Sequence, residues 1–364
     1  MSKLEEILHG FAGSYLTSQS SIGAFPAGHN GPYIDPEKPT RNTAHALFLL
    51  ASIYAREPSE LIKSAAVRAI DYLFSVEARP ASATFYCRDK EGKDHCNGLV
   101  GQAWVMEALI KAAKVFDRPD CYKLAEEVFL LHKFNEKIGI WHRVEIDGAE
   151  LSFDGTFNHQ LWFAAVAAQL DKTPVAQEQA LSFLRKVASK VMLYPNGVVF
   201  HGSPMGSVFD YLSLGLRRFA GQVKGRLVLK RRLADLYSKS VGYHGFNLYA
   251  YAMLKDIFPS EAIWSSDLIA KITDVVESSD FQSELVNSEF GYFYNVSGIE
   301  IAFAMEVLCN DKERAQTWLN RQFEYTCEDA AYPLTKGVVD KNTAMARLYQ
   351  AARLKNDYEV KCGK

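Results

Sequence analysis

The sequence has no long apolar run and no excess of charge of one sign. No stretch of its 364 residues approaches the roughly 20 apolar residues of a membrane-spanning helix. The 41 Lys and Arg nearly balance the 43 Asp and Glu, so bulk charge indicates neither a nucleic acid nor a membrane as partner. The first residues, MSKLEEILHGF, carry acids early and lack the apolar centre of a secretory signal. We therefore expect a cytoplasmic protein without these two partners.

Cysteine pairs and the common catalytic motifs are also missing. Six cysteines are scattered along the chain and form no CxxC pair, so we expect reduced thiols and neither a zinc ribbon nor a disulfide framework. The metalloprotease motif HExxH, a phosphate-binding loop with its Lys, the GxSxG elbow and the kinase signatures do not occur. We expect no metal ion and no cofactor.

The sequence does contain a repeated pair of helices. In each pair an apolar helix, rich in small residues, follows a loop with Gly, Asn and aromatic residues, and an amphipathic helix comes next. Such units cannot bury their faces alone, so they pack against one another. Six pairs predict an all-α (α/α)6 toroid formed by one domain, residues 1–364, with an open solenoid as the alternative. The inner helices are predicted to begin near Asn42, Asn97, Phe157, Tyr243, Val296 and Asn342.

A basic helical insertion at about 205–240 interrupts the repeat. Its Lys and Arg side chains form a solvated helix face in the simplest interpretation. They are also suited to a basic wall beside the cleft that recognises an anionic glycan, or to a contact in a homo-oligomer. The basic residues are Arg217, Arg218, Lys224, Arg226, Lys230, Arg231 and Arg232.

The loops that precede the inner helices gather the polar and aromatic residues of a candidate site. All of these loops open at one end of a toroid, where helix N-termini favour anionic ligands. Aromatic rings stack on sugar C–H faces, and amides and guanidinium groups bind hydroxyl groups and carboxylates. We expect catalysis by Asp94, Asp154 and His159. We expect substrate binding by His29, Arg41, His45, Arg88, Trp141, His142, Arg143, Asn158, Tyr211, Tyr243 and His244.

An ordered series of motifs from residue 94 to 170 resembles a known family. The strings DHCNGLVGQ, RPDCYKLAEEV, GIWHR and SFDGTFN occur in the order and near the spacing found in unsaturated glucuronyl and rhamnogalacturonyl hydrolases of the six-hairpin glycosidase superfamily. The chain departs from the pattern in three places. The family's Asp-Asp pair is reduced to Asp94, and Phe153 stands where the family has Trp. The string YHGFNLYAYAML, residues 243–254, resembles the family's G-N-G-W inner helix but lacks its Trp and its Arg.

The resemblance implies a glycoside hydrolase that hydrates an unsaturated uronyl residue. In that mechanism Asp154 is the general acid and base, with a pKa raised by Phe153 and Phe157 beside it. Asp94 orients the substrate or the water. Trp141 and His142 bound the sugar subsite.

Other interpretations stay open for the same loops. The string FNHQLW, residues 157–162, resembles a helix of (α/α) polysaccharide lyases. That resemblance implies that Asn158 neutralises a uronate and His159 takes the proton, with Tyr211 or Tyr243 as the acid. A sugar epimerase on this fold is a related alternative. The third reading is a non-catalytic protein that binds a glycan or assists assembly. All of these readings have an anionic oligosaccharide as partner.

Overall fold

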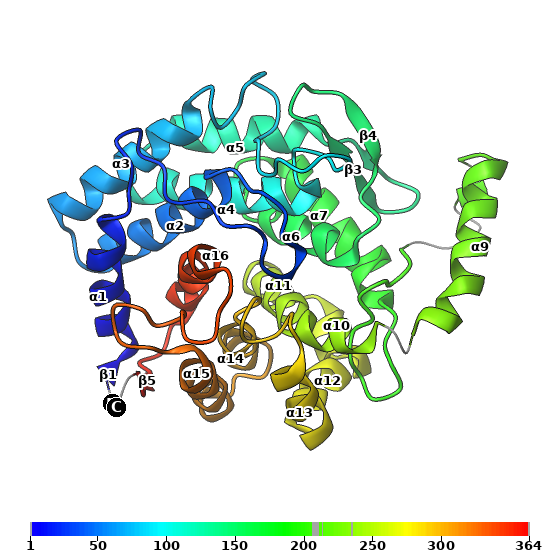
Figure 1. Ribbon diagram of the computed structural model, residues 1–364. Helices are drawn as coiled ribbons and strands as arrows, with labels where there is room; N and C mark the ends of the chain where they lie inside the picture. Colours follow the sequence, from blue (N-terminus) through cyan, green and yellow to red (C-terminus); the bar gives the residue numbers. More distant parts are fainter. Residues whose placement is uncertain (1, 206–210, 213, 234–235, 363–364) are drawn as a thin grey trace.

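The chain folds into a closed ring of paired helices (Figure 1). The computed structural model describes residues 2–205, 211–212, 214–233 and 236–362. Each inner helix packs against the next, and the last, α16 with η5, packs back onto α2. This closure confirms the toroid and rejects the open solenoid. The inner helices are α2 (Thr40–Arg56), α4 (Gly98–Val115), α6 (Phe157–Ala167), α11 (His244–Ile257), α14 (Ser297–Leu308) and α16 (Lys341–Ala346) continued by η5 (Arg347–Arg353).

The inner helices begin within two residues of the predicted positions because their sequences suit burial on every side. In α6 only His159 is more than marginally exposed, and α14 is buried at nearly all of its positions. Small residues such as Ala164 and Ala165 let neighbouring helices approach closely. Apolar composition on all faces is typical of a helix surrounded by others.

The outer layer consists of amphipathic helices that bury one face against the inner ring. Helix α3, for example, buries Ile62, Ala66 and Leu73 and leaves Leu61 at the surface. The outer helices are α1 (Leu4–Leu16), α3 (Glu60–Phe74), α5 (Pro119–Leu131), α7 (Pro174–Lys186), α12 (Asp267–Asp274), α13 (Ser279–Asn287) and α15 (Lys312–Thr326). Short 3-10 segments are η1 (Gly31–Tyr33), η2 (Ala188–Lys190), η3 (Ala262–Ser265) and η4 (Val275–Glu277).

A small antiparallel sheet lies between α5 and α6. Its strands are β2 (Phe134–Asn135), β3 (Ile140–Val144) and β4 (Glu150–Phe153), in that order. His142 pairs with Phe153 in the β3–β4 hairpin. The hairpin ends immediately before Asp154 and therefore fixes where this carboxylate enters the ring.

The basic insertion contains a helix outside the ring. Helix α9 (Leu216–Arg232) lies to one side of the body in Figure 1, next to the β3–β4 hairpin. Arg218 lies over the ring of Phe153, with 5.6 Å from Cζ to the ring centroid. A short helix, α10 (Tyr237–Gly242), follows and leads into α11. Residues 206–210, 213 and 234–235 of the insertion fall outside the described part of the chain.

The expectation that all thiols are reduced is wrong for one pair. Cys327, at the end of α15, forms a disulfide with Cys362. Strand β5 (Glu359–Val360) precedes Cys362 and pairs with β1 (Ser2–Lys3), so the two ends of the chain meet beside α15. A separation of 35 residues gave no spacing signal for this pair. Cys87, Cys96, Cys121 and Cys309 are free.

We expect Cys362→Ser to lower the free energy of unfolding by about 3–4 kcal/mol, because the open loop of 35 residues regains entropy in the unfolded chain. Urea denaturation followed by circular dichroism measures the change. A reducing agent should destabilise the wild-type protein by the same amount and leave Cys362→Ser unchanged. A wild-type protein that is insensitive to reduction would show that the disulfide does not stabilise the fold.

Candidate functional site

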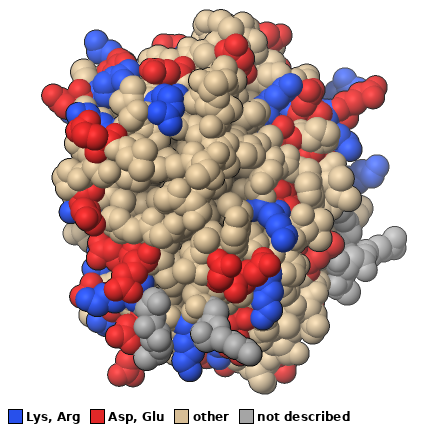
Figure 2. Space-filling view, turned by 60° about the vertical axis from the view of Figure 1, so that its left-hand side comes forward, with Lys and Arg blue, Asp and Glu red and all other residues tan. Residues whose placement is uncertain are grey.

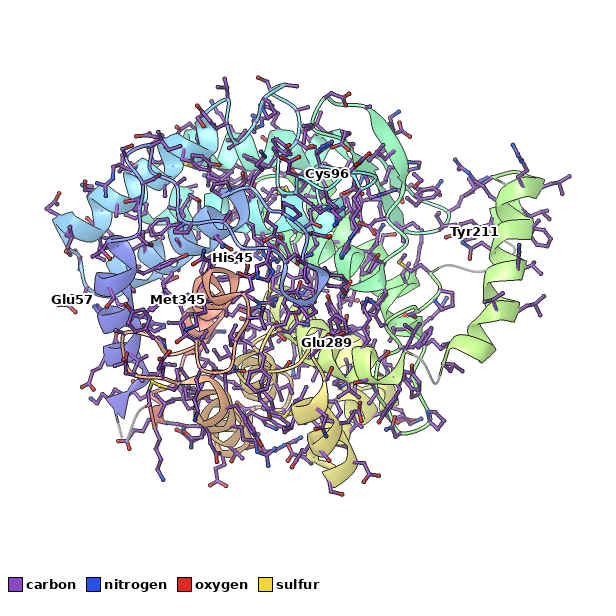
Figure 3. The ribbon with its side chains drawn as sticks, viewed as in Figure 1. His45, Glu57, Cys96, Tyr211, Glu289 and Met345 are labelled. Atoms are coloured by element: carbon purple, nitrogen blue, oxygen red, sulfur yellow. A yellow bond between two sulfur atoms is a disulfide. The ribbon has the colours of Figure 1, made fainter. Side chains whose placement is uncertain are left out.

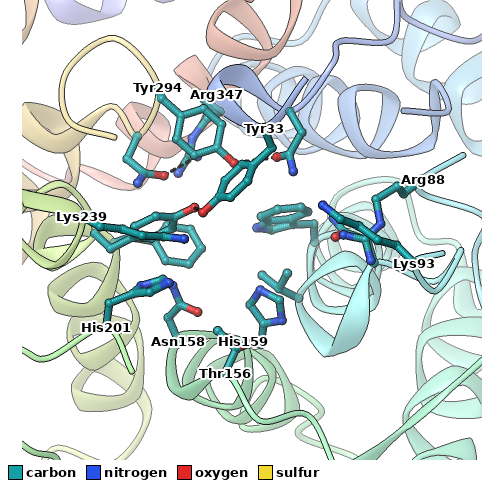
Figure 4. Close-up of a pocket in the computed structure, with 17 residues that line it drawn as sticks. Tyr33, Arg88, Lys93, Thr156, Asn158, His159, His201, Lys239, Tyr294 and Arg347 are labelled. Carbon is teal, nitrogen blue, oxygen red and sulfur yellow. Dashed lines mark hydrogen bonds between the residues drawn. The ribbon is translucent and has the colours of Figure 1, made fainter. Parts of the chain in front are cut away.

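A cavity of about 200 Å³ opens among the N-terminal ends of the inner helices. This is the end of the ring predicted from the loops. The labelled side chains in Figure 4 converge on it from several separate segments of the chain. The lining residues are Asn30, Tyr33, Arg88, Lys93, Asn97, Val100, Trp104, Thr156, Asn158, His159, His201, Lys239, Tyr243, Phe246, Tyr294, Asn295 and Arg347.

The charge of the cavity wall is entirely positive. Arg88, Lys93, Lys239 and Arg347 line the wall, and no Asp or Glu does so among the described residues. Asn30, Asn97, Asn158 and Asn295 add amide groups, and Trp104 and Phe246 add aromatic faces. Cationic and amide donors beside aromatic rings suit a ligand that carries both hydroxyl groups and a negative charge.

His159 is held by a buried carboxylate behind the wall. Its Nδ1 lies 2.9 Å from Oδ2 of Asp154, and its side chain is 27% exposed. The carboxylate is placed to accept a proton from Nδ1, and in the neutral imidazole with that tautomer the lone pair lies on Nε2. A side chain at position 98 would collide with this pair: a Cβ on Gly98 would lie 2.5 Å from Asp154 Oδ2 and 2.8 Å from His159 Nδ1.

The surroundings of Asp154 favour its ionised form. The backbone N–H groups of Leu99 and Thr156 donate to its carboxylate, both at 3.0 Å, in addition to His159. Burial raises the pKa of Asp154, but the charge and hydrogen bond of His159 and the two backbone donors outweigh it and lower the pKa to about 2. The expected raised pKa is therefore wrong, because these donors stabilise the anion more than Phe153 and Phe157 desolvate it.

This lowered pKa predicts an acid-dependent loss of stability. The unfolded chain binds the proton more readily than the folded one, so the stabilisation is present above the ordinary pKa and is lost as the pH falls toward about 2. Between about pH 5 and pH 2 we expect wild-type protein to lose about 2 kcal/mol more unfolding free energy than Asp154→Asn. Urea denaturation across this range measures both proteins. Parallel pH profiles would contradict the prediction.

Asp94 also lies behind the wall and positions a cation. It accepts a hydrogen bond from Arg88 at 2.8 Å, forms an ion pair with Arg143, and accepts the backbone N–H of Gly98 at 2.9 Å. Although burial opposes ionisation, the charge of Arg88 is the largest of the influences that lower the pKa of Asp94. Arg88 thus reaches the cavity with its guanidinium fixed by a carboxylate that does not itself line the wall.

Three tyrosines and a second histidine complete the wall opposite α4. The hydroxyl groups of Tyr33 and Tyr243 lie 2.8 Å apart, and that of Tyr294 donates to Asn30 at 2.6 Å. Burial raises the pKa of all three tyrosines, so they stay neutral. His201 lies against Tyr243, with ring centroids 4.5 Å apart, and burial lowers its pKa to about 3.

Several predicted binding residues lie near the cavity but do not line it. Arg41 is buried beneath the floor, forms an ion pair with Glu37 at 3.0 Å and stacks on Trp104. His45 stacks on Tyr349, and burial lowers its pKa well below the ordinary value. His29 lies 3.2 Å from the carbonyl oxygen of Gly31. These side chains support the wall because the loops that precede α2 and α14 fold over them.

The other predicted binding residues have structural contacts away from the cavity. Trp141 is fully buried between β2, α6 and α7, because its indole N–H reaches Gln179. His142 lies 3.0 Å from the carbonyl oxygen of Leu151 within the hairpin. His244 accepts the N–H of Val199 and donates to the carbonyl oxygen of Ile272. Tyr211 donates to the carbonyl oxygen of Met205 and lies toward α9 (Figure 3).

The structure thus keeps Arg88, Asn158, His159 and Tyr243 of the predicted set in the cavity wall. It adds Lys93, Trp104, Lys239 and Arg347, none of which was predicted as a site residue. The signal for Arg347 was present, because it is a charged residue in an otherwise apolar inner helix. Lys239 had no such signal, since it stands in the basic insertion among many cations.

One protein of known name matches this chain along nearly its whole length. Archaeal glycosylation protein Q of Haloferax volcanii is 39% identical over 375 residues, which cover 99% of each chain. This chain belongs to the archaeal glycosylation protein Q family. No protein-family profile matches it. Two proteins with this identity share a fold. The cavity described above can therefore be tested in both proteins.

Solved structures similar to this family member confirm the toroid. They include an α-1,6-mannanase of Salegentibacter sp. HEL1_6 in complex with α-1,6-mannotriose, with 11% identity, a TM-score of 0.56, and coverage of 96% of this chain and 98% of that one. A cellobiose 2-epimerase of Bacillus thermoamylovorans has 11% identity, a TM-score of 0.60, and coverage of 95% and 96%. A D-mannose isomerase has 13% identity, a TM-score of 0.60, and coverage of 96% of each chain.

No helix among the described residues is long and apolar enough to cross a membrane. No group of three or more His, Cys, Asp or Glu side chains in the described part of the chain is placed to hold a metal ion.

Proposed function

We propose that this chain is a carbohydrate-active enzyme that moves a proton at the carbon next to a uronate carboxylate, with His159 as the base. The observation that carries this proposal is the cavity wall itself. It presents four cations and no carboxylate among the described residues, together with a histidine whose Nδ1 is bound to a buried aspartate. The product we infer is the epimerised sugar.

The substrate class follows from the charge of the wall and from the relatives. Arg88, Lys93, Lys239 and Arg347 place positive charge in the wall, where a carboxylate would bind. Three of these cations also pair with carboxylates behind the wall: Arg88 with Asp94 at 2.8 Å, Lys93 with Asp35 at 2.6 Å and Arg347 with Glu300 at 2.7 Å. The related protein is named for glycosylation, and the similar structures are named as a mannanase, an epimerase and an isomerase, which all act on sugars. The cavity is smaller than most ligand sites, which span roughly 300–1,000 Å³. It therefore suits one uronate unit at the end of a saccharide.

The groups that reach the cavity support the proposed reaction type. Glycoside hydrolysis ordinarily uses two carboxyl groups that flank the bond, and neither Asp94 nor Asp154 lines the wall. His159 Nε2 can instead take the proton from C5 of the uronate, while the cations stabilise the charge that develops on its carboxylate. The Tyr243 hydroxyl, linked to Tyr33, returns a proton to the opposite face. The base lies in α6 and the acid immediately precedes α11, so they approach the cavity from different segments, and an inversion requires them on opposite faces of C5.

Deuterium oxide distinguishes this reaction from its alternatives. Oligosaccharides with a terminal uronate, saturated or unsaturated, are incubated with the protein and analysed by mass spectrometry and proton NMR. We expect one deuteron to enter the saturated uronate at C5, with a new epimer signal. A gain of one water by the unsaturated sugar would favour hydration, and cleavage to an unsaturated fragment would favour elimination. No change in any sugar would favour a binding protein. Neutral oligosaccharides are the control.

A further inference from the structure

Helix α9 is exposed at most of its described positions, and only Phe219 and Gln222 among them are half-buried. The side facing the ring is small and polar: Arg218, Gly221, Gln222 and Gly225 line a cavity against β4 and the loop at 202–205. The opposite side carries the apolar residues. Leu216, Ala220, Val223 and Leu227 follow the helical spacing of one stripe, and all four are exposed.

The exposure of this stripe is large for apolar side chains. Leu216 is 76% exposed and Leu227 is 73% exposed, and the neighbouring Val228 is 42% exposed. An outer helix normally turns such residues inward, as α3 does with Ile62 and Leu73. The described part of the chain therefore leaves the stripe on α9 exposed, and a surface of this kind marks an interaction site.

The charge of α9 indicates what covers the stripe. Residues 216–232 contain seven Lys and Arg and no Asp or Glu, although the whole chain has a net charge of −2. Among the basic residues whose side chains are described, Arg217 and Lys224 are exposed along one side of the stripe. On the face shown in Figure 2, in contrast, Lys and Arg are interspersed with Asp and Glu.

We propose that α9 binds the surface of an anionic lipid bilayer, with its apolar stripe in the interface and its basic residues at the phosphate groups. An exposed apolar stripe bordered by Lys and Arg is the pattern of helices that lie in a membrane surface. A second copy of the chain fits less well, because a symmetric contact through this stripe would bring the basic residues of two α9 helices together. The net charge of the chain does not reveal this site, because acidic residues elsewhere cancel the positive charge of α9.

The experiment is cosedimentation of the full chain with vesicles. We expect the protein to pellet with vesicles rich in phosphatidylglycerol, to stay in solution with phosphatidylcholine alone, and to be released by salt. Arg217→Gln with Lys224→Gln should weaken binding by roughly 25-fold, because each basic residue near the surface contributes about fivefold. Leu216→Glu with Leu227→Glu should abolish pelleting.

Matched controls lie on other helices. Leu61→Glu, at a side chain of α3 that is 66% exposed, is the control for replacing an exposed Leu by Glu. Lys63→Gln with Lys123→Gln is the control for removing two exposed cations. These variants should pellet like wild type, and thermal unfolding should show that all variants fold.

Absence of pelleting with anionic vesicles, or pelleting that the α9 variants do not change, would overturn the proposal. If the wild-type protein forms a dimer without vesicles, and the double variant Leu216→Glu with Leu227→Glu is a monomer, the stripe would instead be the contact with a second copy of the chain. The proton-transfer proposal is tested with soluble sugars, so either proposal can fail alone.

Discussion

His159→Ala should lower kcat by about 10²–10⁴, the range that a general base contributes, while KM changes little. The physical reason is that the imidazole is the only base that the buried aspartate orients toward the cavity among the described residues. Deuterium incorporation into a uronate substrate measures the loss. His9→Ala is a matched control, because its side chain is 30% exposed on α1, outside the cavity. An active His159→Ala would remove the proposed mechanism.

Asp154→Asn should reduce activity because it disturbs His159, and not because Asp154 itself transfers a proton to the substrate. Both carboxylate oxygens accept hydrogen bonds, from Leu99 and His159 at one and from Thr156 at the other. An amide offers only one acceptor oxygen, so its NH₂ group must face a donor and disturb either the backbone or the imidazole tautomer. We therefore expect lower activity together with lower stability. Full activity in this variant would show that the Asp154 contact does not set the state of His159.

Arg347→Met should lower the free energy of unfolding by about 3–5 kcal/mol, because it leaves a buried carboxylate without its partner. Arg347 donates to Glu300 at 2.7 Å and to Asn295 at 2.8 Å, and both charged side chains are nearly inaccessible to solvent. Burial already raises the pKa of Glu300 to about 7, and Arg347 opposes that rise. Urea denaturation followed by circular dichroism measures the change.

The control for Arg347→Met is an exposed pair of the same length. Arg185 and Glu261 also lie 2.7 Å apart, but Arg185 is 61% exposed, so Arg185→Met should change stability by at most about 1 kcal/mol. Adding Glu300→Gln to Arg347→Met should recover much of the loss, since it removes the isolated charge. Equal effects of Arg347→Met and Arg185→Met would contradict the importance of burial.

The sequence alone predicted the ring because local composition decides which helices are buried. The string FNHQLWFAAVA is apolar on every face, so only an inner position satisfies it, and α6 begins at Phe157 as expected. The loops before such helices necessarily share one end of the ring. For this reason Asn158, His159 and Tyr243, which stand at helix starts, were found.

Tertiary structure alone decided the chemical state of the candidate residues. The N–H of Leu99, 55 residues away in sequence, helps to lower the pKa of Asp154, whose carboxylate also contacts His159. Trp141 of strand β3 points into the core, where Gln179 of the outer helix α7 accepts its N–H. The pattern of α9 showed an amphipathic helix, but only its packing showed that Leu216 and Leu227 face outward. The spacing of apolar residues determines the period of a helix. Long-range contacts determine which face of the helix points outward and which titratable side chains are charged.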